Sequence, residues 1–165
     1  MYTPDHIYLR ERGFEPASSV GMLRTMAGDQ KLKLLKTVPL FASCDAREIE
    51  RLGMLVDEVD LPAGRVLFHQ GDLAHELYIV VSGQVRVERD GEVLANRGPS
   101  EFLGEIALVA GGPRTATVTL VTDCRLLVLG RRDFHSLMDE FPALKMRVLE
   151  TLAKRVYSLD TTSVH

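Results

Sequence analysis

The sequence has few cysteines, no excess of positive charge and no long apolar run. Two cysteines among 165 residues cannot build a disulfide framework, so we expect a protein of the reducing cytoplasm. The 20 basic and 23 acidic side chains give a formal net charge of −3, which supplies no positive field for direct DNA binding. Residues 1–12 have no apolar core and no run reaches transmembrane length, so neither a secretory signal nor a membrane span is expected.

The hydrophobic content of 45% is sufficient for one packed domain, and its periodicity divides the chain into helices, strands and helices again. Residues 1–27 combine scattered proline and glycine with weak periodicity, which predicts a flexible N-terminal arm before a domain at 28–165. Lys31–Lys36 has helical spacing, and Asp45 with Glu48 forms a capping pair that predicts the start of another helix. Two short helices are therefore expected before the strands.

From Asp57 to Gly130, short apolar alternations are separated by turns at regular spacing. Leu77, Ile79 and Val81 share one face of a predicted strand, and Asp90-Gly91 is typical of a hairpin turn. Many short strands of this kind predict a mainly β fold, a double-stranded β-helix or jelly roll over about 57–130. Helical periodicity returns over 131–160, so helices should flank the roll at both ends.

The most specific chemistry lies in Phe102–Leu108 and Pro113–Val118, which are separated by a short turn. Gly104 lets the backbone approach a ligand, a helix beginning there would present N–H groups to an anion, and Arg114 adds a planar fork of donors. Glu105 places a carboxylate beside this anion site, where it is repulsive unless it has hydroxyl donors to bind. A surface ion pair between Glu105 and Arg114 is the simpler structural alternative.

These segments resemble the cyclic nucleotide-binding domain of kinase regulatory subunits, cyclic nucleotide-gated channels and catabolite-activator-type proteins. The resemblance covers about 32–159 and also includes Gly64, Gln70-Gly71-Asp72, Leu77–Val80 and Gly83. It implies an eight-stranded β-roll with helices at both ends that binds cAMP or cGMP.

The same resemblance implies roles for individual residues. Arg114 would pair with the exocyclic phosphate oxygens, and Glu105 would accept from the ribose 2′-OH. Gly104, Ala107 and Thr115 would offer backbone N–H groups or a hydroxyl, and Ile106 completes the predicted ligand-binding set. Thr115 stands where cAMP-binding kinase domains often carry Ala, and its hydroxyl can meet a guanine amino group, yet channel domains with Thr also accept cAMP. The hydroxyl of Thr115 is thus ambiguous, and the resemblance to the family as a whole favours cAMP over cGMP.

Two histidines and an acid suggest a different class of function. His69, His75 and Glu76 could be interpreted as metal ligands of a cupin-like metal-dependent enzyme on a jelly roll. Because the two histidines flank the Gly71-Asp72 turn and have no second histidine pair nearby, solvated turn histidines are the favoured interpretation. No nucleophile with a base is recognisable either, so we expect a non-enzymatic protein without a metal.

The last helix is the predicted route from ligand to output. Its stripe of Leu144, Val148, Leu152 and Val156 is typical of core, with a homodimer seam as the alternative. In relatives of the family the terminal helix moves over the pocket, which makes Arg155 and Tyr157 the candidates to cap the base. Pro142 is the expected position of a bend between the C-terminal helices.

The sequence contains none of the effector segments that accompany this domain in its relatives. A stand-alone sensor that acts through an unidentified effector protein is therefore the favoured hypothesis. A truncated piece of a larger cyclic-nucleotide-dependent regulator and a β-roll that no longer binds ligand remain as alternatives, and the intact cassette disfavours the second.

Overall fold

The computed structural model describes residues 28–104 and 111–162, and the predicted N-terminal arm lies outside them. Two helices, α2 (Gly28–Thr37) and α3 (Ala46–Leu55), precede the strands, with a short 3-10 helix η2 (Pro39–Phe41) between them. Two more, α5 (Arg131–Glu140) and α6 (Pro142–Thr162), follow the strands. The predicted order of helices, strands and helices is confirmed.

Eight strands in the described part of the chain form two antiparallel sheets. One sheet has the order β1-β8-β3-β6 and the other β2-β7-β4-β5, so neighbouring strands are not consecutive in the chain except in the β4–β5 hairpin. This is the predicted jelly roll. The strands are β1 (Asp57–Leu61), β2 (Val66–Phe68), β3 (Glu76–Ser82), β4 (Val85–Arg89), β5 (Glu92–Arg97), β6 (Phe102–Leu103), β7 (Thr117–Leu120) and β8 (Cys124–Gly130).

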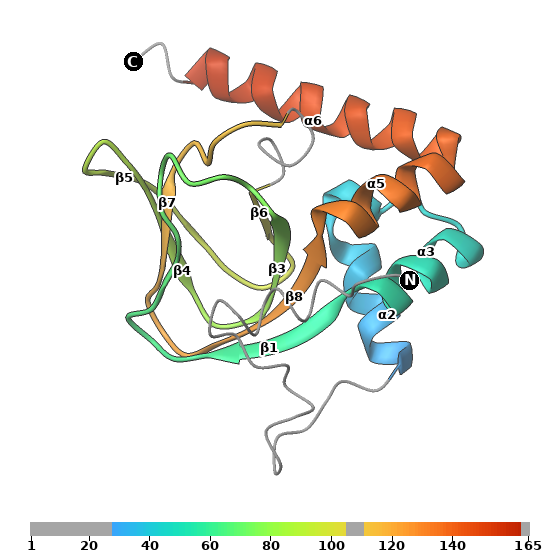
Figure 1. Cartoon of the computed structure of the whole chain (residues 1–165), viewed down its shortest axis with the longest axis horizontal. Helices are drawn as coiled ribbons and strands as arrows, with labels where there is room; N and C mark the ends of the chain where they lie inside the picture. The colour runs from blue at the N-terminus through green and yellow to red at the C-terminus, as the bar shows by residue number, and fades with distance from the viewer. Residues whose placement is uncertain (1–27, 105–110, 163–165) are drawn as a thin grey trace.

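The sheet formed by β1, β8, β3 and β6 is buried on both faces, which gives the domain two hydrophobic cores. One core fills the space between the two sheets and includes Tyr78, Val80 and Val118. The other lies between the first sheet and the helices, where Leu77 and Ile79 pack with residues of all the described α-helices. Figure 1 shows α2, α3 and α5 gathered beside β1 and β8, and α6 running along the top of the view above the strands.

Helix α3 is fixed at its first turn and then tied to α6. Asp45 Oδ1 accepts from Glu48 N at 2.8 Å and Glu48 Oε1 accepts from Asp45 N at 2.9 Å, which confirms the predicted capping pair. The same Glu48 oxygen accepts from Arg147 Nη2 of α6 at 2.6 Å. One buried carboxylate therefore serves both the helix start and the packing of the C-terminal helix.

Helix α6 begins at Pro142, where the missing N–H costs no intrahelical hydrogen bond. Leu144, Val148 and Leu152 are buried in the helix-side core, as expected for a core stripe, whereas the side chain of Val156 lies outside the described residues. Over residues 28–104 and 111–162, no helix is both long enough and apolar enough to span a membrane.

Candidate anion site at Arg114

Arg114 lies in the connection from β6 to β7, and the turn after β2 holds its backbone. Gly71 N donates to Arg114 O at 2.9 Å, and Arg114 N donates to Asp72 O at 2.7 Å. The neighbouring residues Leu73 and Pro113 form an isolated antiparallel bridge. This pairing fixes where the long Arg114 side chain starts.

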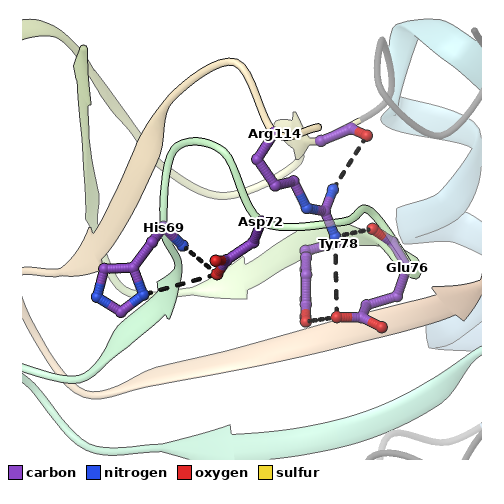
Figure 2. A network of polar contacts seen from close by, with 6 residues as sticks. His69, Asp72, Glu76, Tyr78 and Arg114 are labelled. Carbon is purple, nitrogen blue, oxygen red and sulfur yellow. Dashed lines mark hydrogen bonds and ion pairs between the residues drawn. The ribbon is translucent and has the colours of Figure 1, made fainter. Parts of the chain in front are cut away.

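The guanidinium of Arg114 is enclosed rather than solvated, because its side chain is only 1% exposed. Nη1 donates to Gly104 O at 3.2 Å and Nη2 donates to Glu76 O at 2.7 Å (Figure 2). The guanidinium carbon Cζ of Arg114 lies 4.0 Å from the ring centroid of Phe68 and 5.9 Å from that of Tyr78. The alternative of a surface ion pair is wrong for Arg114.

Gly104 follows β6 and must be glycine for two reasons. Its φ of +84° lies in the left-handed region, which side chains rarely adopt. A Cβ at this position would overlap Arg114 Nη1 and would also lie 3.2 Å from Cζ. The backbone at the start of the predicted cassette is therefore in direct contact with the predicted phosphate-binding arginine.

Glu76 and Tyr78 belong to the same polar cluster, although the sequence analysis did not place them there. Tyr78 Oη donates to Glu76 Oε1 at 2.5 Å, and the same carboxylate oxygen is 3.8 Å from Arg114 Nη2 (Figure 2). Glu76 is 1% exposed and is therefore an interior acid. The sequence signal that could have identified this pair is an acid two residues before a tyrosine in an otherwise apolar strand, because residues at this spacing lie on the same face of the sheet.

Thr115 is exposed, and its carbonyl accepts from Arg89 Nε at 2.9 Å. A second link joins the β2–β3 turn to the β4–β5 hairpin, where Gln70 Nε2 donates to Asp90 Oδ1 and Asp90 N donates to Gln70 Oε1, both at 3.0 Å. Gln70 N also donates to Thr117 Oγ1 at 2.8 Å. The hairpin and the Arg114 loop are thus tied together next to the anion site.

The other predicted site residues are placed only in part. Glu105, Ile106 and Ala107 lie outside the described residues, as does the side chain of Arg155. Tyr157 is 75% exposed on α6. Their assignments to ribose, phosphate and base stay predictions.

The histidines considered as metal ligands lie at the surface. His69 has a side chain that is 67% exposed, with Nδ1 3.6 Å from Asp72 Oδ2, and its backbone N donates to the same oxygen at 3.0 Å (Figure 2). His75 is also exposed. Within the described ranges, no three His, Cys, Asp or Glu residues are grouped so that they could hold a metal ion.

The two cysteines are buried and suited to packing. Burial raises the pKa of the Cys44 thiol to about 11, and burial likewise raises the pKa of Cys124. Cys124 borders a shallow hollow at the far end of β3 from Glu76, together with Asp60, Ser82 and Arg125. Because a thiolate is the reactive form, neither cysteine has the properties of a nucleophile.

Residues 58–141 match the family model described as the cyclic nucleotide-binding domain. The chain belongs to this family. The cyclic nucleotide-binding domain match includes every described strand from β2 to β8, most of β1, and the Arg114 loop.

Similar proteins extend the match beyond the family model. The N-terminal domain of a transcriptional regulator from Streptomyces coelicolor is 38% identical, with a TM-score of 0.67 over 78% of this chain and 95% of that chain. The cyclic AMP receptor protein of Thermus thermophilus is 34% identical over 76% of this chain and 61% of that protein. The regulatory domain of Toxoplasma gondii PKA, solved with cAMP, is 32% identical, with a TM-score of 0.67 over 81% of this chain and 53% of that chain.

This cyclic nucleotide-binding domain spans only part of its relatives. It covers 61% of the Thermus receptor and 53% of the Toxoplasma chain, whereas it covers 95% of the Streptomyces domain. The activities of the longer relatives as whole proteins therefore involve residues outside the part that this chain matches.

Proposed function

We propose that this protein is a non-enzymatic sensor that binds a cyclic nucleotide, with cAMP favoured over cGMP, in the cytoplasm. The observation that carries the proposal is the buried guanidinium of Arg114, held against the backbone of Gly104. A fixed, buried guanidinium next to a glycine with positive φ is a suitable partner for a phosphate. The proposed binding domain is 28–165, following the arm 1–27.

In this proposal the phosphate binds Arg114, with backbone N–H groups from Gly104 and Ala107 and the hydroxyl or N–H of Thr115. Glu105 accepts from the ribose 2′-OH, and Ile106 lies in the same cassette. Because Gly104 and Arg114 lie near the two ends of the β6–β7 connection, one anion in contact with both would hold these ends together.

The preference for cAMP is supported by two relatives. One is named as a cyclic AMP receptor protein, and the structure of the other contains cAMP. Thr115 is exposed beside the anion site, so its hydroxyl is accessible to either purine ligand. The comparison of cAMP with cGMP is therefore part of the test.

The output is proposed to depend on α6. Arg155 and Tyr157 would cap the base when α6 moves toward the ligand, and Tyr157 is exposed in this structure and therefore accessible for that contact. Occupancy would reach an unidentified effector protein through the position of α6, without direct contact to DNA, and a homodimer through α6 is the alternative use of that helix.

Isothermal titration with cAMP, cGMP and 5′-AMP tests the proposal. We expect saturable binding of cAMP, weaker binding of cGMP and much weaker binding of 5′-AMP, which has the same base and sugar but an open, more highly charged phosphate. Absence of saturable binding of both cyclic nucleotides at millimolar concentration would contradict the proposed function.

A further inference from the structure

The guanidinium of Arg114 already has an anionic neighbour inside the protein. Glu76 Oε1 lies 3.8 Å from Arg114 Nη2, and the side chains of the two residues are 2% and 1% exposed. The hydrogen bond from Nη2 goes to the backbone oxygen of Glu76, at 2.7 Å, and not to its carboxylate. The peptide oxygen thus positions the guanidinium, while the carboxylate supplies a charge.

Tyr78 holds that carboxylate from its other side. Its hydroxyl donates to Glu76 Oε1 at 2.5 Å, the same oxygen that is nearest to Arg114. The Tyr78 ring is itself fixed by stacking with Phe68, at 5.9 Å between centroids, and Phe68 also contacts the guanidinium. The hydroxyl therefore stabilises the negative charge on Glu76 and weakens the attraction between this carboxylate and the guanidinium of Arg114.

We propose that Glu76 competes with the ligand phosphate for Arg114, and that Tyr78 limits the strength of this competition. The inference rests on the proposed function, since it requires a phosphate to reach Arg114. The Glu76 carboxylate oxygen lies 3.8 Å from Arg114 Nη2, and a phosphate oxygen at a hydrogen-bond distance of about 3 Å on the other side of the guanidinium would lie roughly 7 Å from it, so the two negative charges would repel each other. At an effective dielectric constant between about 20 and 80, this repulsion weakens the affinity by roughly threefold to fiftyfold.

The Glu76→Gln variant removes the charge and keeps both the side-chain shape and the positioning backbone oxygen. We expect it to bind cAMP about tenfold more tightly in isothermal titration. Glu58→Gln is the matched control, because Glu58 Oε2 lies 3.9 Å from Arg125 Nη1 and its side chain is 9% exposed. It changes the net charge equally, on a strand separated from β3 by β8, and should leave the affinity within about twofold.

Tyr78→Phe should have the opposite effect. Without the hydroxyl, the carboxylate of Glu76 acts on Arg114 more strongly, so cAMP should bind more weakly. In the Glu76→Gln background the same change should have no effect on affinity, because the competing charge is gone. A purely structural role for the pair predicts weaker binding in both single variants.

The outcomes separate this inference from the proposed function. No saturable cAMP binding by the wild-type protein overturns the proposed function. Wild-type binding combined with equal or weaker binding by Glu76→Gln overturns only the competition. If circular dichroism shows that Glu76→Gln does not fold, Glu76→Ala, which also removes the charge and keeps the positioning backbone oxygen, takes its place: tighter binding of cAMP supports the competition, and equal or weaker binding overturns it.

Discussion

The contact between Gly104 and Arg114 can be tested with alanine, because Gly104 and Gly64 have nearly the same positive φ but differ in their surroundings. Gly104 has φ +84° and Gly64 has φ +88°, whereas a Cβ on Gly64 would meet nothing within 4 Å and one on Gly104 would overlap the guanidinium. Gly64→Ala should therefore lower the unfolding free energy only by the cost of holding a residue with a Cβ at positive φ, about 1–2 kcal/mol.

Gly104→Ala has the same backbone cost and also displaces Arg114 Nη1 from its hydrogen bond to Gly104 O. A hydrogen bond to a charged group contributes about 1.5–3 kcal/mol, so the total loss should be about 3–5 kcal/mol. Because the displaced guanidinium is the proposed phosphate partner, cAMP affinity should also fall at least about tenfold, and Gly64→Ala should leave it unchanged.

Urea unfolding followed by far-UV circular dichroism measures the stability of both variants, since the chain has no tryptophan to report by fluorescence. A third comparison isolates the steric contact: in the Arg114→Ala background, Gly104→Ala should cost no more than Gly64→Ala. Equal losses of stability and of affinity for Gly104→Ala and Gly64→Ala in the wild-type background would refute the reasoning.

Three further predictions concern the rest of the domain. Because burial raises the pKa of both thiols, iodoacetamide at pH 8 should label Cys44 and Cys124 in urea but not in the folded protein, and equal labelling rates would contradict this. Asp45→Ala removes one half of the capping pair and should lower the unfolding free energy by about 1 kcal/mol in urea titration without changing cAMP affinity; a loss near zero would contradict the cap. Saturating cAMP should slow amide exchange in Pro142–Thr162, and matching exchange with and without ligand would count against movement of α6.

The parts of the fold that follow from local sequence were predictable. Alternation placed Leu77 and Ile79 on one face of β3, and the spacing of Asp45 and Glu48 gave the start of α3. The two-residue strand β6 was not predicted, because two residues are too few to show a period.

Gly104 and Arg114 were both predicted as ligand-binding residues, and the structure places them in contact because both belong to the short connection between β6 and β7. The other neighbours of the guanidinium come from β2 and β3, which closure of the roll brings beside it. Phe68 and Glu76 are separated from Arg114 by long stretches of sequence, so spacing alone could not pair them. Only the register of the sheets makes Glu76 an interior acid.

The central claim is that Arg114 binds the phosphate of a cyclic nucleotide. It is tested most directly by titrating cAMP into wild-type protein, Arg114→Ala and Arg125→Ala, with folding checked by circular dichroism. Arg125 is also largely buried and pairs with Asp60 at 2.9 Å, and its loss changes the net charge equally. We predict that Arg114→Ala weakens cAMP binding by about 2–5 kcal/mol while Arg125→Ala leaves it nearly unchanged. Equal affinity of the wild-type protein and Arg114→Ala would contradict the account.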